Sequence, residues 1–152
     1  MLVYIIFNQE LRWKMQADWV VAKATKWVLA SRHLARPAAG ISPRQMHQLC
    51  QAVAVPSFTY AADVWLMPIC RDTGDKRFRG SIGTVRKLTT VQHMATAAVM
   101  GVLHTSASDI MEVHANLMPI ELLLNKVCHW ASLRLAALLE SPPLYKPVHQ
   151  SV

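Results

Sequence analysis

A short apolar segment bounded by two prolines, residues 56–68 (PSFTYAADVWLMP), most constrains how this chain can fold. Four residues recur at i, i+3, i+4 and i+7, a spacing that places them on one face of a helix: Phe58, Ala61, Ala62 and Trp65. Because that face is aromatic and aliphatic, we expect a small domain to bury it at its centre. The pattern therefore predicts that Phe58, Tyr60 and Trp65 organise the core and that other helices pack around them.

Helical periodicity also extends through most of the remaining chain. The pattern predicts further helices at residues 10–35, 42–55, 85–102, 105–115 and 119–139. Ser42 followed by Pro43 is typical of a helix start, and we expect this helix to stop before Pro56. We expect Ile110, Val113 and Leu117 to face inward from the short helix at 105–115 and its end. The predicted fold class is all-α, an irregular bundle of about six helices.

Three segments depart from this pattern. Residues 1–9 include a β-branched and aromatic run, which predicts one short unpaired N-terminal strand whose sheet would lie outside this chain. Residues 69–84 collect arginines, lysines and glycines and are predicted to form a basic flexible loop. Residues 141–152 begin with Ser141-Pro142-Pro143, which ends the preceding helix, and are predicted to be a mobile tail. At 152 residues, the whole of 1–152 is expected to be one helical domain.

The charge balance indicates an anionic partner. The formal net charge is +7, and nucleic acid is the commonest partner of such a basic chain. Lys23 and Lys26 share one side of the first predicted helix with Arg12, and Trp19 lies among them. This face is suited to phosphates and a stacked base, although the same pattern also describes an ordinary solvated helix face.

The apolar content points to a second kind of contact. Hydrophobic residues make up 53% of the chain, and the mean hydropathy is +0.21. These values are high for an isolated soluble domain, because a monomer rarely leaves a large apolar patch in water. We therefore expect a neighbouring domain or subunit to cover part of the surface. No apolar run has the length needed to cross a bilayer, so a membrane partner is not expected.

Residues with catalytic or metal-binding chemistry are not grouped in the sequence. Asp63 stands alone, whereas two-metal phosphoryl transfer needs paired carboxylates. The seven histidines form no i, i+4 pair, and the three cysteines form no C-x-x-C motif. We expect no catalytic residue, metal or cofactor, so the chain is not predicted to be an enzyme on its own. Reduced thiols favour an intracellular location, in the nucleus or cytoplasm.

Several segments resemble one family of polymerases. The matching residues, in chain order, are Tyr4-Ile5-Ile6-Phe7-Asn8 with Leu11-Arg12-Trp13, Ala54-Val55-Pro56 with Tyr60 to Trp65, Arg86-Lys87-Leu88 with Val91-Gln92, the Gly101 to Thr105 turn, and Glu112 to Pro119 followed by Arg134-Leu135 and Ser141-Pro142-Pro143-Leu144. In order and spacing they resemble the helical thumb and connector of LINE-type (non-LTR) retrotransposon reverse transcriptases, notably fungal ones. In that family this region lies between the palm and a C-terminal ribonuclease H-like domain.

The resemblance implies a noncatalytic fragment of an RNA-directed DNA polymerase. The chain would begin after the palm carboxylates and end before the ribonuclease H acidic residues, with both domains as its missing partners. In that setting we expect the helices to contact the backbone of an RNA/DNA hybrid through basic side chains. The expected contacts are Arg12, Lys23, Lys26, Arg86 and Lys87. The alternative is a free-standing helical interaction protein that forms a homo-oligomer through its apolar surface.

Overall fold

A computed structural model of the chain describes residues 5–6, 13–34, 40–71, 78–103 and 105–137. These residues confirm the all-α class. The helices are α1 (Lys14–Arg32), α2 (Pro43–Leu49), the π-helix η1 (Cys50–Ala54), α3 (Val55–Thr59), α4 (Ala62–Trp65), α5 (Ile82–Met100), α6 (Ser108–His114) and α7 (Ile120–Ala136). Two short strands, β1 (Cys70–Arg71) and β2 (Phe78–Arg79), pair antiparallel.

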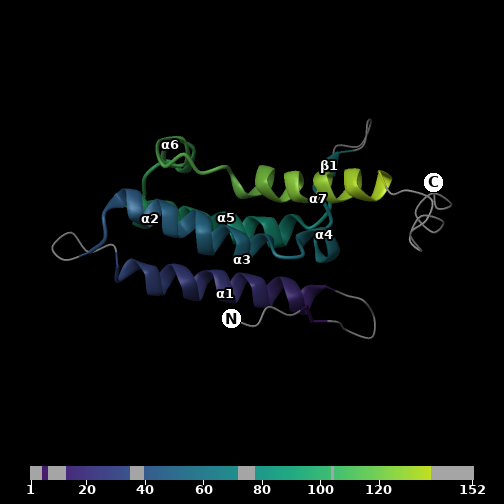
Figure 1. Cartoon of the computed structure of the whole chain (residues 1–152), viewed down its shortest axis with the longest axis horizontal. Helices are drawn as coiled ribbons and strands as arrows, with labels where there is room; N and C mark the ends of the chain where they lie inside the picture. Colours follow the sequence, from purple (N-terminus) through teal and green to yellow (C-terminus); the bar gives the residue numbers. More distant parts are fainter. Residues whose placement is uncertain (1–4, 7–12, 35–39, 72–77, 104, 138–152) are drawn as a thin grey trace.

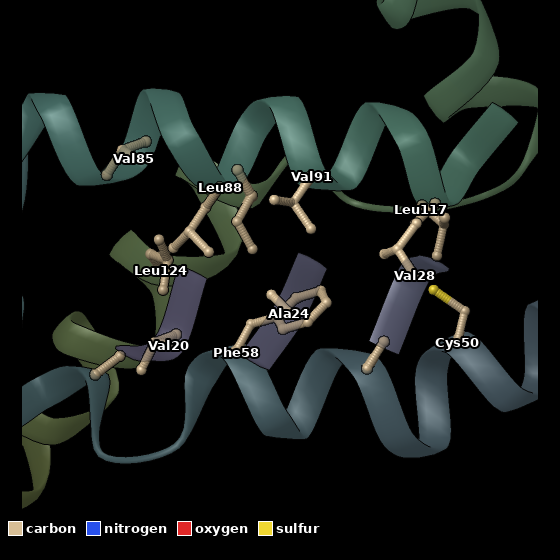
Figure 2. Close-up of a cluster of buried hydrophobic side chains, with 14 of the residues drawn as sticks. Val20, Ala24, Val28, Cys50, Phe58, Val85, Leu88, Val91, Leu117 and Leu124 are labelled. Atoms are coloured by element: carbon tan, nitrogen blue, oxygen red, sulfur yellow. The ribbon is translucent and has the colours of Figure 1, made fainter. Parts of the chain in front are cut away.

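The long helices run side by side, and α5 lies at the centre. Figure 1 shows α1 along one side of the molecule and α7 along the other, with α5 and the α2–α3 segment between them. Helix α5 contacts α1, α2, α6 and α7. Its inward face carries Val85, Leu88, Val91, Ala95 and Val99, which meet Val20, Ala24 and Val28 of α1, Phe58 of α3 and Leu124 of α7 (Figure 2). Small α1 side chains at this contact permit close packing of α1 against α5.

One continuous helix runs from Pro43 to Thr59. Its start is confirmed, because the Ser42 hydroxyl accepts a hydrogen bond from the Gln45 backbone N–H and the Gln45 side chain accepts one from the Ser42 N–H. The predicted stop before Pro56 is wrong. The turn preceding Pro56 is π-helical, and the Val55 N–H donates to the Cys50 carbonyl, five residues back. Such a widened turn relieves the clash that a proline ring makes in an ordinary α-helix.

The predicted helix at 56–68 is broken at Tyr60 and Ala61. Ala61 has a φ of +49°, a left-handed conformation, and the Trp65 indole N–H donates to the Tyr60 carbonyl at 3.0 Å across the break. Phe58 and Trp65 are buried, as predicted. Tyr60 is 43% exposed, so its assignment to the core was wrong. The chain therefore divides at this break and not at Pro56.

The predicted N-terminal strand and basic loop are also revised. Ile5 and Ile6 are not in a strand, and the Ile6 N–H donates to the Gln16 side chain at 2.9 Å; the rest of 1–9 lies outside the described residues. Within 69–84, Cys70 pairs with Arg79 in the ladder, and α5 already begins at Ile82. Residues 72–77 and the tail at 141–152 lie outside the described part of the chain.

Helix α6 has a different inward face from the one expected. Ile110 and Val113 are exposed, the latter at 79%, whereas Met111 and Glu112 are buried. Helix α6 spans only 7 residues, and two turns of hydrophobic spacing do not define which side faces a core. The predicted inward orientation of Ile110 and Val113 was therefore wrong, whereas Leu117, which follows the helix, is buried as predicted.

Candidate nucleic-acid interface

An open groove of about 750 Å³ lies between the first turns of α1 and the first turns of α5. The end of α4 and residues 66–68, which connect α4 to the ladder, form its third side. Lys14 and Asp18 line it from α1, and Thr84 and Lys87 line it from α5. Residues separated by about 70 positions in the sequence therefore share one surface, because α1 packs along α5.

A close backbone contact holds the start of α5 against this third side. The Ser81 N–H donates to the Met67 carbonyl at 3.0 Å, and the Met67 N–H donates to the Ser81 hydroxyl at 3.0 Å. Gly80 has a φ of +116°, and a Cβ atom at this position would lie 2.4 Å from the Pro68 carbonyl oxygen. Only glycine allows this approach, so Gly80 positions the N-terminus of α5 at the groove.

The first turn of α5 lines the groove and has no side-chain cap. The Ser81 hydroxyl does not cap α5, and its first turn contains no acidic residue. Gly83 and Thr84, from that turn, line the groove. The uncapped N–H groups and the aligned peptide dipoles make a helix N-terminus favourable for a negative group such as a phosphate.

Two lysines and one aspartate set the electrostatics of the groove. The Lys87 ammonium donates to the Asp18 carboxylate at 2.8 Å, and both side chains are exposed. This hydrogen bond, more than the charge of Lys87 alone, holds the pKa of Asp18 below its usual value, and Lys14 adds a smaller effect in the same direction. An exposed ion pair is weak because water and salt screen it. Lys87 can therefore exchange Asp18 for an external anion.

Among the four predicted phosphate contacts that the structure describes, only Lys87 lines the groove. The fifth, Arg12, lies outside the described residues. Arg86 is exposed but is rotated by about 100° from Lys87 on α5 and does not line the groove. Lys26 is exposed and lies about 18 Å along α1 from Lys14. The four described members of the predicted set do not form a single surface.

Lys23 is placed unfavourably for contact with phosphates. Its Nζ atom is buried and lies 4.7 Å from the centre of the Trp19 ring, and Trp19 is itself partly buried against the core. Lys23 is also rotated by about 140° from Asp18 around the axis of α1. The structure therefore makes the predicted Trp19 and Lys23 surface a cation–π contact within the molecule.

Lys14 was missed by the sequence reasoning, although a signal for it was present. Lys14 and Asp18 are four residues apart, as are Trp13 and Ala17, so each pair lies on the same side of α1. The two pairs are also adjacent in the sequence, and together they form one side of the first turns of this helix. The sequence does not show that this side meets the start of α5. That proximity arises from tertiary packing.

Other polar groups of the described residues have structural roles. The Asp63 carboxylate lies 4.0 Å from the Arg134 guanidinium. Cys50, Cys70 and Cys128 are free thiols. Within the described ranges, no group of three or more histidine, cysteine or acidic side chains could hold a metal ion. No helix among these residues is long and apolar enough to cross a membrane.

Comparisons with known proteins identify no relative. The chain matches no protein-family model, and neither curated proteins nor solved structures include a match. The fold and the groove define an all-α protein with a basic surface at the junction of two helices. A functional assignment consequently depends on the geometry of that surface and on the sequence resemblance.

Proposed function

We propose that this chain is a noncatalytic helical module that contacts the phosphate backbone of nucleic acid. The observation that carries the proposal is the convergence of Lys14, Lys87 and the N-terminus of α5 on one open groove. In the terms of the sequence resemblance, the module is the thumb and connector of a LINE-type reverse transcriptase, and its ligand is the primer–template RNA/DNA hybrid. The palm and ribonuclease H-like domains would then be its partners.

The chemistry of the groove favours phosphate over a base edge. Two ammonium groups and the backbone N–H groups of α5 all donate hydrogen bonds, and none of them distinguishes one base from another. A phosphate bound here takes the place of Asp18 as the partner of Lys87. Such contacts release counterions, so the affinity falls steeply as salt increases and depends little on sequence.

The test is a salt titration of binding to a fluorescently labelled RNA/DNA hybrid, followed by anisotropy. Replacing one phosphate-contacting lysine is expected to reduce the slope of log affinity against log salt by about 0.9. The Lys14→Gln and Lys87→Gln double variant should therefore lose about 1.8 from the slope. Lys126→Gln is the matched control, because Lys126 is an exposed helical lysine on α7, away from the groove.

The control separates a site from general charge attraction. If Lys126→Gln lowers the slope as much as each groove variant does, the binding is spread over the surface and the groove is not the site. A native protein that does not bind the hybrid at low salt, or binds it without salt dependence, refutes the proposal. Equal affinity for hybrids of different sequence is expected.

A second candidate function is self-association through an apolar face. Leu122, Trp130 and Leu133 occupy the outward side of α7, together with Lys126 and His129. Leu122 and Trp130 are 58% and 57% exposed. This stripe lies opposite the buried face of the same helix, and a second copy of the chain, or a neighbouring domain, would cover it.

Light scattering distinguishes the two candidates. A stable symmetric oligomer in the absence of nucleic acid, converted to monomer by Trp130→Glu, supports the interaction protein. A monomer whose hybrid binding is unchanged by Trp130→Glu supports the nucleic-acid module, in which this stripe faces another domain.

A further inference from the structure

A second cavity, of about 200 Å³, lies in the interior at a distance from the basic groove. Its walls come from η1 and α3, from the middle of α5, and from the segment that leads into α7. Phe58, Ala95 and Ile120 are among the buried residues that line it. Figure 2 shows Phe58 and Cys50 pointing from the η1–α3 helix toward the interior, with Leu117 on the facing side. A cavity of about 150 Å³ with similar apolar walls accommodates benzene.

The cavity has access to solvent along one edge. Gln51 and Met118 line it and are exposed, and Val55 and Leu123 are half-buried. These four side chains lie between the cavity and the surface. A small molecule can therefore enter by side-chain motion without unfolding of a helix.

One buried polar group in this wall lacks a partner. Gln92 is 7% exposed, and its Nε2 donates to the Met118 carbonyl at 2.8 Å, but its Oε1 is buried and accepts no hydrogen bond. The Met118 carbonyl sets the orientation of the amide, because a flipped amide would bring two acceptors together. The unsatisfied Oε1 is costly to bury, and a ligand that donates a hydrogen bond removes that cost.

The remaining wall selects against a charged ligand. Burial raises the pKa of the Cys50 thiol to about 11, so this residue stays protonated and neutral at pH 7. No lysine, arginine or carboxylate lines the cavity among the described residues. The site combines apolar walls with one acceptor, which suits a neutral ring that carries a single donor.

We propose that this cavity is a binding site for a neutral single-ring aromatic molecule with one O–H or N–H donor, which hydrogen-bonds to Oε1 of Gln92. Phenol is the simplest probe of this class. The aromatic ring packs against Phe58 and Leu117, and the phenol O–H donates to Gln92. The site is independent of the basic groove, so its occupancy does not depend on nucleic-acid binding.

The test is a double-mutant cycle with phenol and toluene as ligands, measured by NMR titration of the native chain and Gln92→Met. Phenol and toluene have similar shapes, but only phenol can donate to Gln92. We expect saturable binding of both to the native chain. Gln92→Met should lower the affinity for phenol about tenfold more than it lowers the affinity for toluene. The same substitution at an exposed helical glutamine, Gln48→Met, is the matched control and should change neither affinity.

Two outcomes would overturn the proposal. One is the lack of saturable phenol binding to the native chain, in which case the cavity holds only water. The other is an equal change in phenol and toluene affinity in Gln92→Met, which leaves no role for Oε1. Intermolecular NOEs in the native chain provide a test that needs no variant. They should join phenol protons to the methyl groups of Ala95, Leu117 and Leu123, and NOEs confined to other residues would contradict the site.

Discussion

Replacing Gly80 with alanine is expected to be more damaging than the same replacement at Gly83 or Gly101. The new Cβ would lie 2.4 Å from the Pro68 carbonyl oxygen, which is backbone and cannot rotate away as a side chain can. The φ of +116° is itself unfavourable for alanine. Both effects disturb the two hydrogen bonds between Met67 and Ser81, which hold the start of α5 at the groove.

The size of the loss follows from these two terms. A non-glycine residue held in such a conformation costs about 1–3 kcal/mol. Movement of the Pro68 carbonyl also weakens the two Met67–Ser81 hydrogen bonds, each of which contributes about 1 kcal/mol. We expect a total loss of about 2–4 kcal/mol, which for a chain of this length lowers Tm by on the order of 10 °C.

Two other glycines provide internal controls for thermal and urea unfolding of the same series. Gly101 has a φ of +66° but has open space where a Cβ would lie, so Gly101→Ala should cost only about 1–2 kcal/mol. Gly83 lies in α5, has a negative φ and also faces open space, so Gly83→Ala should stabilise by about 0.5 kcal/mol. The reasoning is refuted if Gly80→Ala loses no more stability than Gly101→Ala.

Four further substitutions test the core, the groove and a buried acid. Phe58→Ala should cost about 3–4 kcal/mol in urea unfolding and Tyr60→Ala less than about 1 kcal/mol, because only Phe58 is buried; equal losses would contradict the core assignment. Asp18→Asn should raise affinity for the RNA/DNA hybrid several-fold at low salt, because Lys87 loses its internal partner; an unchanged anisotropy curve would remove Lys87 from the interface. Burial, with a smaller effect from Asp109, raises the pKa of Glu112 in the folded state. The raised pKa adds to the free energy of unfolding below about pH 4, where Glu112 is protonated in both states. This added stability is lost as the pH rises through the raised pKa. Glu112→Gln should therefore stabilise the fold at pH 7 but not at pH 4 in denaturation, and an equal effect at both values would exclude this cause.

The sequence alone determined the helical class and several local boundaries. The spacing of apolar residues predicted the long helices, and Ser42 with Pro43 predicted the start of α2. Gly101 likewise marked the end of α5, where it adopts a left-handed conformation. These predictions succeeded because the signals are local, since each depends on the dihedral preferences and hydrogen bonds of neighbouring residues.

Local signals were insufficient where two of them competed. Pro56 predicts a helix end, but the chain continues through a π-helical turn because burial of Cys50 and Phe58 stabilises the continuous helix. Ala61 carries no sequence signal for a left-handed turn. That turn places both Phe58 and Trp65 in the core, and packing outweighs the local preference of alanine.

The two candidate sites depended on tertiary structure. Lys14 and Lys87 lie far apart in the sequence and approach each other only because α1 packs along α5. In the same way, the sequence shows Gln92 only as a polar residue in an amphipathic helix. In the folded chain, the segment leading into α7 packs over Gln92, and its Met118 carbonyl pairs with Nε2 but leaves Oε1 without a partner. Periodicity determines which side of a helix is apolar, whereas the contacts between helices decide which polar groups converge and which remain unpaired.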